Sequence, residues 1–240
     1  MSGRRIVIAA AGEGVGRTAT AVNLAVELTH GGWSVMLADL DPEAGATRAL
    51  GQEPARDPWG EPAAVIELDG GALHLVRGGR ALAGATSSDV RRLVEGIPSH
   101  DIILVDTPAE VTTIPAAAAE GAELLLVPLR PGPEAVRELR SVAQLLTLVQ
   151  TEACLLRAVL VRTGEAAPTA AARVELEQAY PGATYDSVVP EHPAITEAMQ
   201  AGESLARLAP ESAAAAAYRM LAIEVMADLD RLATIPEPDR

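Results

Sequence analysis

Short, continuously apolar runs alternate with longer amphipathic segments along most of this chain, and this alternation constrains the fold more than any other feature. The clearest runs are Ile102-Ile103-Leu104-Val105 and Leu124-Leu125-Leu126-Val127. Strands that are apolar at every position are typical of sheets covered by helices on both faces, and those sheets are mainly parallel. The pattern predicts an α/β fold of three layers, with a mainly parallel twisted sheet between helices.

The expected elements follow from the same periodicity. Strands are expected near residues 4–9, 33–38, 101–106, 122–128 and 155–161, and helices at 18–30, 88–96, 133–149, 170–180, 194–201 and 211–233. A strand pair is expected at Ala63–Leu68 and Leu73–Val76, because Asp69-Gly70-Gly71 forms a suitable turn. The alternation continues on both sides of the proline-rich loop 51–61. We expect one domain over residues 1–235 and a disordered tail at 236–240.

Charge and cysteine usage exclude several classes of protein. The formal net charge of −14 disfavours diffuse attraction to nucleic acid or anionic lipid. Cys154 is the only cysteine, so a disulfide framework or a thiolate metal cluster within one chain is excluded. The sequence has no secretory signal, and no apolar run approaches the roughly 20 residues that cross a bilayer. These features predict a soluble, cytoplasmic protein.

A glycine-containing loop follows the first apolar run, in the sequence AAGEGVGRTATAVNLA from Ala10 to Ala25. Between a strand and a helix, the backbone N–H groups of Gly14, Val15 and Gly16 can surround an anion, aided by the helix dipole. The hydroxyl of Thr18 would then be a Mg²⁺ ligand. The alternative is that the glycines serve only a tight turn, since G-x-G alone is a weak signal.

Carboxylates follow two further strands. Asp39-Leu40-Asp41-Pro42-Glu43 comes after the second expected strand, and Asp106-Thr107-Pro108-Ala109 comes after a later one. In a Mg²⁺-nucleotide site, Asp106 would hold a water of the magnesium shell, and Asp41 would orient or activate the attacking water. Each aspartate has an alternative interpretation as the cap of the next helix. Three such loops together favour the nucleotide site.

Taken together, these motifs resemble the ParA/MinD family of deviant Walker ATPases, and the likeness covers nearly the whole chain. The motifs are Gly14–Ala25, Asp39–Glu43, Asp106–Ala109, Val127–Pro133, Val189–Glu191 and Ala198–Leu205. The resemblance implies a P-loop NTPase-like fold, bound ATP or ADP with Mg²⁺, and an ATP-sandwiched homodimer that positions DNA, organelles or protein complexes. The nucleotide-binding residues that it implies are Gly14, Val15, Gly16, Arg17, Thr18, Ala19 and Pro190, with Thr18, Asp41 and Asp106 at the metal and Asp41 and Arg17 in catalysis.

The loop departs from the family pattern, which reads K-G-G-x-G-K-S/T. The first lysine falls on Gly12, the second glycine on Glu13 and the second lysine on Arg17. All 19 cationic Lys+Arg residues are arginine, so the family's first lysine, which reaches the partner's phosphates, has no replacement by another lysine. Arg17 keeps a positive charge, but its planar head is wider than an ammonium. A GC-rich coding bias is an alternative explanation for Arg17.

Of these departures from the family pattern, Glu13 is expected to weaken the binding of ATP the most. A carboxylate roughly 5 Å from a phosphate charge, at an effective dielectric near 20, is disfavoured by about 3 kcal/mol. This corresponds to about a hundredfold in affinity, unless the side chain points outward or meets an arginine. We therefore predict weakened ATP binding and very slow or absent hydrolysis.

Partners can be compared with the family in the same way. A small basic adaptor of the ParB kind is expected, whereas membrane docking is not, because the last helix carries Glu224, Asp228 and Asp230. Non-specific DNA binding is doubtful because Glu191 is acidic where the family is usually basic, although Arg207, Arg219 and Arg231 could form a patch. Two alternatives stay open: a non-hydrolysing pseudo-ATPase scaffold, and a metabolic relative such as an electron-transfer ATPase or a biotin-pathway ligase.

Overall fold

The computed structural model describes residues 3–109, 113–148, 154–164 and 166–234. Its strands form one eight-stranded sheet in the order β3-β4-β2-β5-β1-β6-β7-β8. The strands are β1 (Arg4–Ile8), β2 (Val35–Asp39), β3 (Ala64–Leu68), β4 (Gly71–Val76), β5 (Ile102–Asp106), β6 (Leu124–Leu129), β7 (Leu155–Thr163) and β8 (Thr184–Pro190). All neighbouring strands run parallel except β3 and β4. The predicted α/β fold with a mainly parallel sheet is confirmed.

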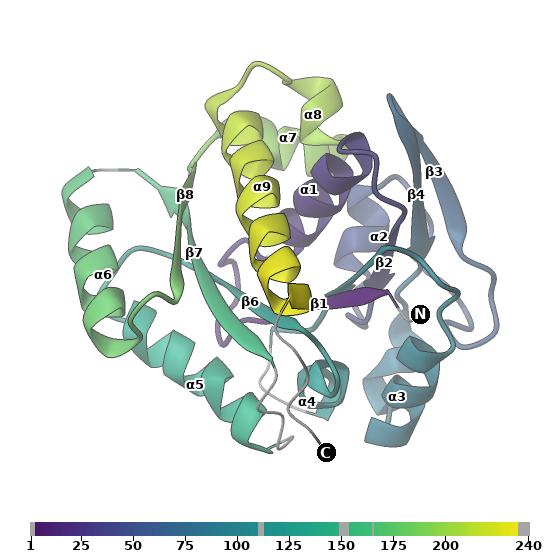
Figure 1. Ribbon diagram of the computed structural model, residues 1–240. Coiled ribbons are helices and arrows are strands. Elements are labelled where there is room, and N and C mark those ends of the chain that lie inside the picture. The colour runs from purple at the N-terminus through teal and green to yellow at the C-terminus, as the bar shows by residue number, and fades with distance from the viewer. Residues whose placement is uncertain (1–2, 110–112, 149–153, 165, 235–240) are drawn as a thin grey trace.

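The sheet is covered by helices on both faces, as Figure 1 shows. The helices are α1 (Arg17–His30), α2 (Gly45–Ala49), α3 (Ser87–Glu95), α4 (Thr113–Ala119), α5 (Ala135–Leu148), α6 (Ala166–Ala179), α7 (Pro193–Ala201), α8 (Leu205–Leu208) and α9 (Ala213–Thr234), with a 3₁₀ turn at Arg80–Gly84. Two separate cores result. One joins the sheet to α1, α2, α7, α8 and α9, and the other joins it to α3, α4, α5 and α6.

The continuous apolar runs explain why both faces can be covered. In β1, Ile6 and Ile8 pack into the first core, while Val7 between them packs into the second. The runs in β5 and β6 divide in the same way, and these two strands flank β1 at the centre of the sheet. Side chains of consecutive strand residues point to opposite faces, so a strand buried twice needs an apolar residue at every position.

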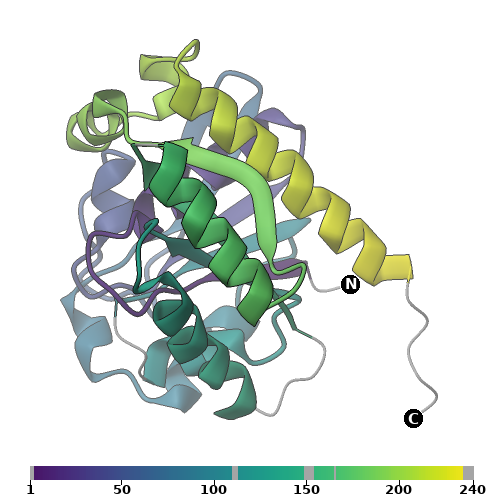
Figure 2. The same ribbon diagram turned by 90° about the vertical axis from the view of Figure 1, so that its left-hand side faces the viewer.

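The hairpin of β3 and β4 forms as predicted, with Gly70 in a left-handed conformation at φ 128°. Gly71 begins β4 instead of belonging to the turn. Sequence patterns missed the edge strand β8, which among the described strands pairs only with β7 and which carries the polar residues Asp186 and Ser187. Figure 2 shows β8 between α6 and α9. The short helices α2 and α8, the 3₁₀ turn and α4, which has Pro115 in its first turn, were missed as well.

The remaining expectations concern the ends and the surface. Among the described residues, no helix is both long enough and apolar enough to span a membrane. The tail expected at 236–240 lies outside the described residues, as does Val149 at the end of one expected helix. The assignment of residues 1–235 to one domain stays a prediction.

Candidate functional site

The carboxyl ends of the central strands open into a cavity of about 750 Å³. Loops after β1, β2 and β5 supply one side of it, and the ends of β7 and β8 together with α7 and α9 supply the other. The lining residues are Gly12, Glu13, Gly14, Val15, Gly16, Arg17, Thr18, Ala19, Asp41, Pro42, Glu43, Ala83, Pro108, Ala109, Ile114, Val161, Arg162, Val189, Glu191, His192, Ile195, Thr196, Met199 and Tyr218. This is where ligands bind in open α/β sheets.

The loop between β1 and α1 depends on two glycines in the left-handed region. Gly14 has φ 66° and Gly16 has φ 79°. A Cβ atom on Gly16 would lie 3.4 Å from Cγ2 of Val161, so space is restricted as well. Helix α1 begins at Arg17 with no side-chain cap on its N-terminus. Its first N–H groups and its dipole therefore offer a site for an anion.

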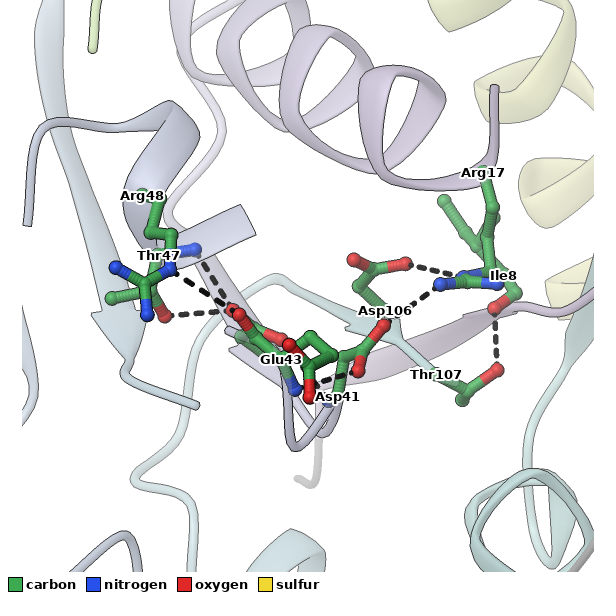
Figure 3. A network of polar contacts seen from close by, with 9 residues as sticks. Ile8, Arg17, Asp41, Glu43, Thr47, Arg48, Asp106 and Thr107 are labelled. Carbon is green, nitrogen blue, oxygen red and sulfur yellow. Dashed lines mark hydrogen bonds and ion pairs between the residues drawn. The ribbon is translucent and has the colours of Figure 1, made fainter. Parts of the chain in front are cut away.

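Arg17 lines the cavity, and its guanidinium contacts two carboxylates, as Figure 3 shows. Its Nη2 donates to Oδ2 of Asp41 at 2.9 Å, and its Nε donates to Oδ1 of Asp106 at 3.3 Å. The arginine is 9% exposed and Asp106 is completely buried. The guanidinium thus bridges the two aspartates that the sequence predicts at the metal.

Asp39 fixes the position of the loop that carries Asp41, a role that the sequence motif did not reveal. Its Oδ1 accepts from the backbone N–H of Asp41, and its Oδ2 accepts from both the N–H and the hydroxyl of Thr47 at 2.8 and 2.7 Å. The Thr47 hydroxyl in turn accepts from the backbone N–H of Gly78 at 2.9 Å. Asp39 is therefore a structural residue that fixes the loop carrying Asp41.

Three carboxylates share this buried region with one arginine. Burial raises the pKa of Asp106 to about 7, against the lowering effects of the Arg17 charge and the Thr18 hydroxyl. Burial also raises the pKa of Asp39 to about 6, against its hydrogen bonds from Thr47 and Asp41. Asp106 is only partly ionised at neutral pH, but the three carboxylates together still carry more negative charge than the one positive charge of Arg17 balances.

Further carboxylates lie at the loop itself. Glu13 is exposed at the cavity and has no ion-pair partner among the described residues. Glu138 of α5 approaches from outside, since a Cβ atom on Gly12 would lie 3.4 Å from its Oε1. Burial raises the pKa of Glu138. The carboxylate of Glu138 is half-buried and faces the loop.

The predicted site residues come together. Gly14, Val15, Gly16, Arg17, Thr18, Ala19 and Asp41 line the cavity, and Asp106 lies beneath it in contact with Arg17. Pro190 ends β8 between Val189 and Glu191, which both line the cavity, and its own contact with a nucleotide stays a prediction. Sequence reasoning missed the part of the lining supplied by β7, α7 and α9, namely Val161, Arg162, Ile195, Thr196, Met199 and Tyr218.

The side-chain oxygens of this site are of the kind that binds a divalent cation. Hard cations such as Mg²⁺ take carboxylate and hydroxyl oxygens, which Asp41, Asp106 and Thr18 supply. Oδ2 of Asp106 is buried with no hydrogen-bond partner among the described residues. Such an atom is rare in a folded protein unless water or an ion satisfies it. The guanidinium of Arg17 competes for the same two aspartates.

Comparisons with known proteins agree with this geometry. The family model described as the CobQ/CobB/MinD/ParA nucleotide binding domain matches residues 6–205. The chain is 35% identical over 243 residues to the chromosome-partitioning ATPase Soj of Thermus thermophilus, which covers 93% of this chain and 96% of that protein. It is 28% identical over 251 residues to the sporulation initiation inhibitor protein Soj of Bacillus subtilis, covering 94% and 99%.

Solved structures share the fold. The septum site-determining protein MinD of Pyrococcus horikoshii, complexed with Mg-ADP, superposes with a TM-score of 0.79 at 23% identity, covering 98% of this chain and all of MinD. An ATP complex of McdA from Cyanothece also superposes with a TM-score of 0.79, at 16% identity over the whole of both chains. At such identities these two likenesses establish the architecture.

Proposed function

The chain belongs to the CobQ/CobB/MinD/ParA family of nucleotide-binding domains, and on this premise we propose that it is a ParA/MinD-like ATP-binding protein acting in intracellular positioning or segregation. We further propose that its nucleotide binding is weakened and its hydrolysis very slow. Support for the first part comes from the 35% identity to a chromosome-partitioning ATPase over nearly the full length. Support for the second part comes from the contacts of Arg17.

The position of Arg17 is the observation that carries the proposal. Its guanidinium contacts both Asp41 and Asp106, so a magnesium ion that uses these carboxylates has to displace it. A buried arginine with two carboxylate partners is costly to move, because removing one partner of a buried pair costs about 3–5 kcal/mol. A bound magnesium ion would offset much of this free-energy cost, because its positive charge would replace that of Arg17 beside the two carboxylates. The remainder reduces the affinity for the Mg²⁺-nucleotide.

Charge around the cavity acts in the same direction. The lining carries the carboxylates of Glu13, Asp41, Glu43 and Glu191 against the guanidinium groups of Arg17 and Arg162. Four of these six groups form two ion pairs at 2.9 Å, Arg17 with Asp41 and Arg162 with Glu191, which leaves the carboxylates of Glu13 and Glu43. A nucleotide therefore enters a cavity whose surplus charge is negative, and its phosphates need magnesium to offset that charge.

Most of the predicted residues would have a definite role with a nucleotide bound. The N–H groups of residues 14–17 and the α1 dipole hold the phosphates. Asp41, Asp106 and Thr18 would hold magnesium and its waters, and the ion would supply charge neutralisation at the phosphates. Asp41 also orients the attacking water. Slow hydrolysis follows because Arg17 binds the same carboxylate and because no lysine reaches across from a partner chain.

We propose a homodimer and a small basic adaptor as the partners. The net charge of −14 favours a basic protein over nucleic acid. The three arginines considered for a DNA patch are paired within the chain: Arg207 with Glu203, Arg219 with Glu27 and Arg231 with Asp228. Each pair lowers the positive potential at its arginine, which supports a protein partner instead of DNA.

A non-hydrolysing scaffold is the second candidate, and one observation favours it. The contacts of Arg17 with Asp41 and Asp106, together with those of Thr47 with Asp39, give these carboxylates protein partners in the absence of a nucleotide. In this alternative, dimerisation and partner binding proceed without nucleotide.

Light scattering combined with phosphate release distinguishes the two. For the ATP-binding protein, Mg²⁺-ATP shifts the mass from monomer to dimer, and phosphate is released far more slowly than by the R17K variant. For the scaffold, the mass is that of a dimer with or without nucleotide. Phosphate release by the wild type at the same rate as by R17K would refute impaired hydrolysis. R140K, a matched change at an exposed arginine of α5, controls for the loss of a guanidinium.

A further inference from the structure

Arg162 has a strained backbone at the edge of the cavity. Its φ is 53°, and Ala44 is the only other non-glycine residue with a positive φ among the described residues. A left-handed conformation costs a residue with a Cβ atom about 1–2 kcal/mol. Strain of this kind is concentrated at active sites and ligand-binding positions, where the surrounding structure maintains it.

The strand is irregular at the same place. The register between β7 and β8 shifts between Val161 and Thr163, so Arg162 is the extra residue of a bulge. A bulge next to a binding site redirects a side chain that regular alternation would send elsewhere. The positive φ and the bulge at this residue therefore determine together where the guanidinium of Arg162 lies.

The guanidinium lies against the phosphate loop. Its Nη1 donates to the carbonyl oxygen of Gly14 at 2.9 Å, and its Nη2 donates to Oε1 of Glu191 at 2.9 Å. The side chains of Arg162 and Glu191 are 43% and 61% exposed, so solvent and a ligand can reach both. An exposed pair of this kind is weak, at about 0.2–1 kcal/mol, and a phosphate can replace the carboxylate.

Arg162 is also the arginine of the cavity lining that a phosphate can reach most easily. The lining contains two arginines, and the other one, Arg17, is bound by Asp41 and Asp106. At position 12, where the family resemblance places a lysine, the chain has glycine. The loop thus lacks a free positive charge of its own, and Arg162 brings one to it from β7.

We propose that Arg162 is a phosphate-binding residue of this site, whose guanidinium leaves Glu191 to contact the phosphate chain of the bound nucleotide. This inference rests on the proposed nucleotide binding. Glu191 is the anion that holds the guanidinium beside Gly14 until the ligand arrives. The strain and the bulge position the arginine in advance, which reduces the entropy lost on binding.

The R162G variant separates this role from a structural one. Glycine adopts the left-handed conformation without strain, so the thermal midpoint of R162G equals or exceeds that of the wild type. Hydrogen bonds to charged groups contribute about 1.5–3 kcal/mol, so calorimetry should show Mg²⁺-ATP affinity lowered about ten- to hundredfold. Adenosine, which has no phosphate, should bind both proteins equally. R140S, which removes an exposed arginine from α5, should leave all three values unchanged.

Variants of Glu191 provide a second test of the same inference. E191Q releases the guanidinium, so its affinity for Mg²⁺-ATP should rise about two- to fivefold. E191Q should give a smaller gain in the R162G background, where it removes a negative charge from the cavity but releases no guanidinium. R162K keeps the positive charge but loses the planar guanidinium, which can form two parallel hydrogen bonds to a phosphate. Its affinity for Mg²⁺-ATP should therefore lie between those of the wild type and R162G.

The outcomes are separable. Equal Mg²⁺-ATP affinity of R162G and the wild type would overturn the inference and leave the proposed function intact. Parallel losses of thermal stability, adenosine binding and ATP binding in R162G would overturn it in favour of a structural role. Absence of any binding of ATP or ADP to the wild type would refute the proposed nucleotide binding and this inference together.

Discussion

Replacing Arg17 by methionine removes the cation of the buried site while keeping the length and the apolar stem of the side chain. At about pH 8.5 the two aspartates then lose their shared partner, and we expect R17M to lower the free energy of unfolding by about 3–5 kcal/mol. At about pH 6 the loss is smaller, because Asp106, whose pKa is about 7, is mainly protonated and no longer needs the arginine.

The difference between the two pH values follows from that pKa. About pH 8.5 lies one and a half units above it, and each unit is worth about 1.4 kcal/mol, so R17M should be about 2 kcal/mol more harmful at the higher pH. Urea denaturation without nucleotide measures both losses, with R140M as the control. Millimolar Mg²⁺ should restore part of the lost stability. Equal losses at both pH values, or none, would show that the guanidinium does not neutralise Asp106.

Three further predictions concern the surroundings of the site. Thr47→Val removes a 2.7 Å donor to Asp39 and the acceptor of the Gly78 N–H, so urea denaturation should show a loss of about 1–3 kcal/mol; no loss would contradict the supporting role of Asp39. Gly16→Ala places a Cβ at φ 79° and 3.4 Å from Val161, so its thermal midpoint should fall with a loss of about 1–2 kcal/mol, and an unchanged midpoint would argue against this loop conformation. The wild type should become less stable as the pH rises from about 4 to 7, because the raised pKa values of Asp39 and Asp106 make the folded state bind more protons than the unfolded state in that window; urea midpoints that rise over it would contradict the burial of these carboxylates.

The central part of the fold is predictable from the sequence because double burial leaves a strong pattern. The runs in β1, β5 and β6 are apolar throughout, and each forms a central strand. Edge strand β8 has no such pattern, because no other described strand pairs with its second edge and polar residues are tolerated there. Helix α4 was not predicted because it contains Pro115. Proline is compatible with the first turn of a helix, but in a sequence it usually indicates the end of one.

The candidate site is predictable to the extent that it lies in local motifs. The loop residues and Asp41 line the cavity because each follows a strand directly. The direction in which Arg17 turns was not predictable, since it depends on two carboxylates from β2 and β5 that are distant in sequence. Arg162 gave no signal in the sequence, because its relevance comes from a bulge and from its ion pair with Glu191, which directly follows the neighbouring strand β8.

Parallel calorimetric titrations of the wild type, R17K and R140K with Mg²⁺-ATP test the central claim most directly. A lysine offers one compact charge and cannot bridge Asp41 and Asp106 as the guanidinium does, so magnesium displaces it more easily. The account predicts that R17K binds Mg²⁺-ATP about tenfold more tightly than the wild type, while R140K is unchanged. Binding by the wild type that is as tight as, or tighter than, binding by R17K would contradict it.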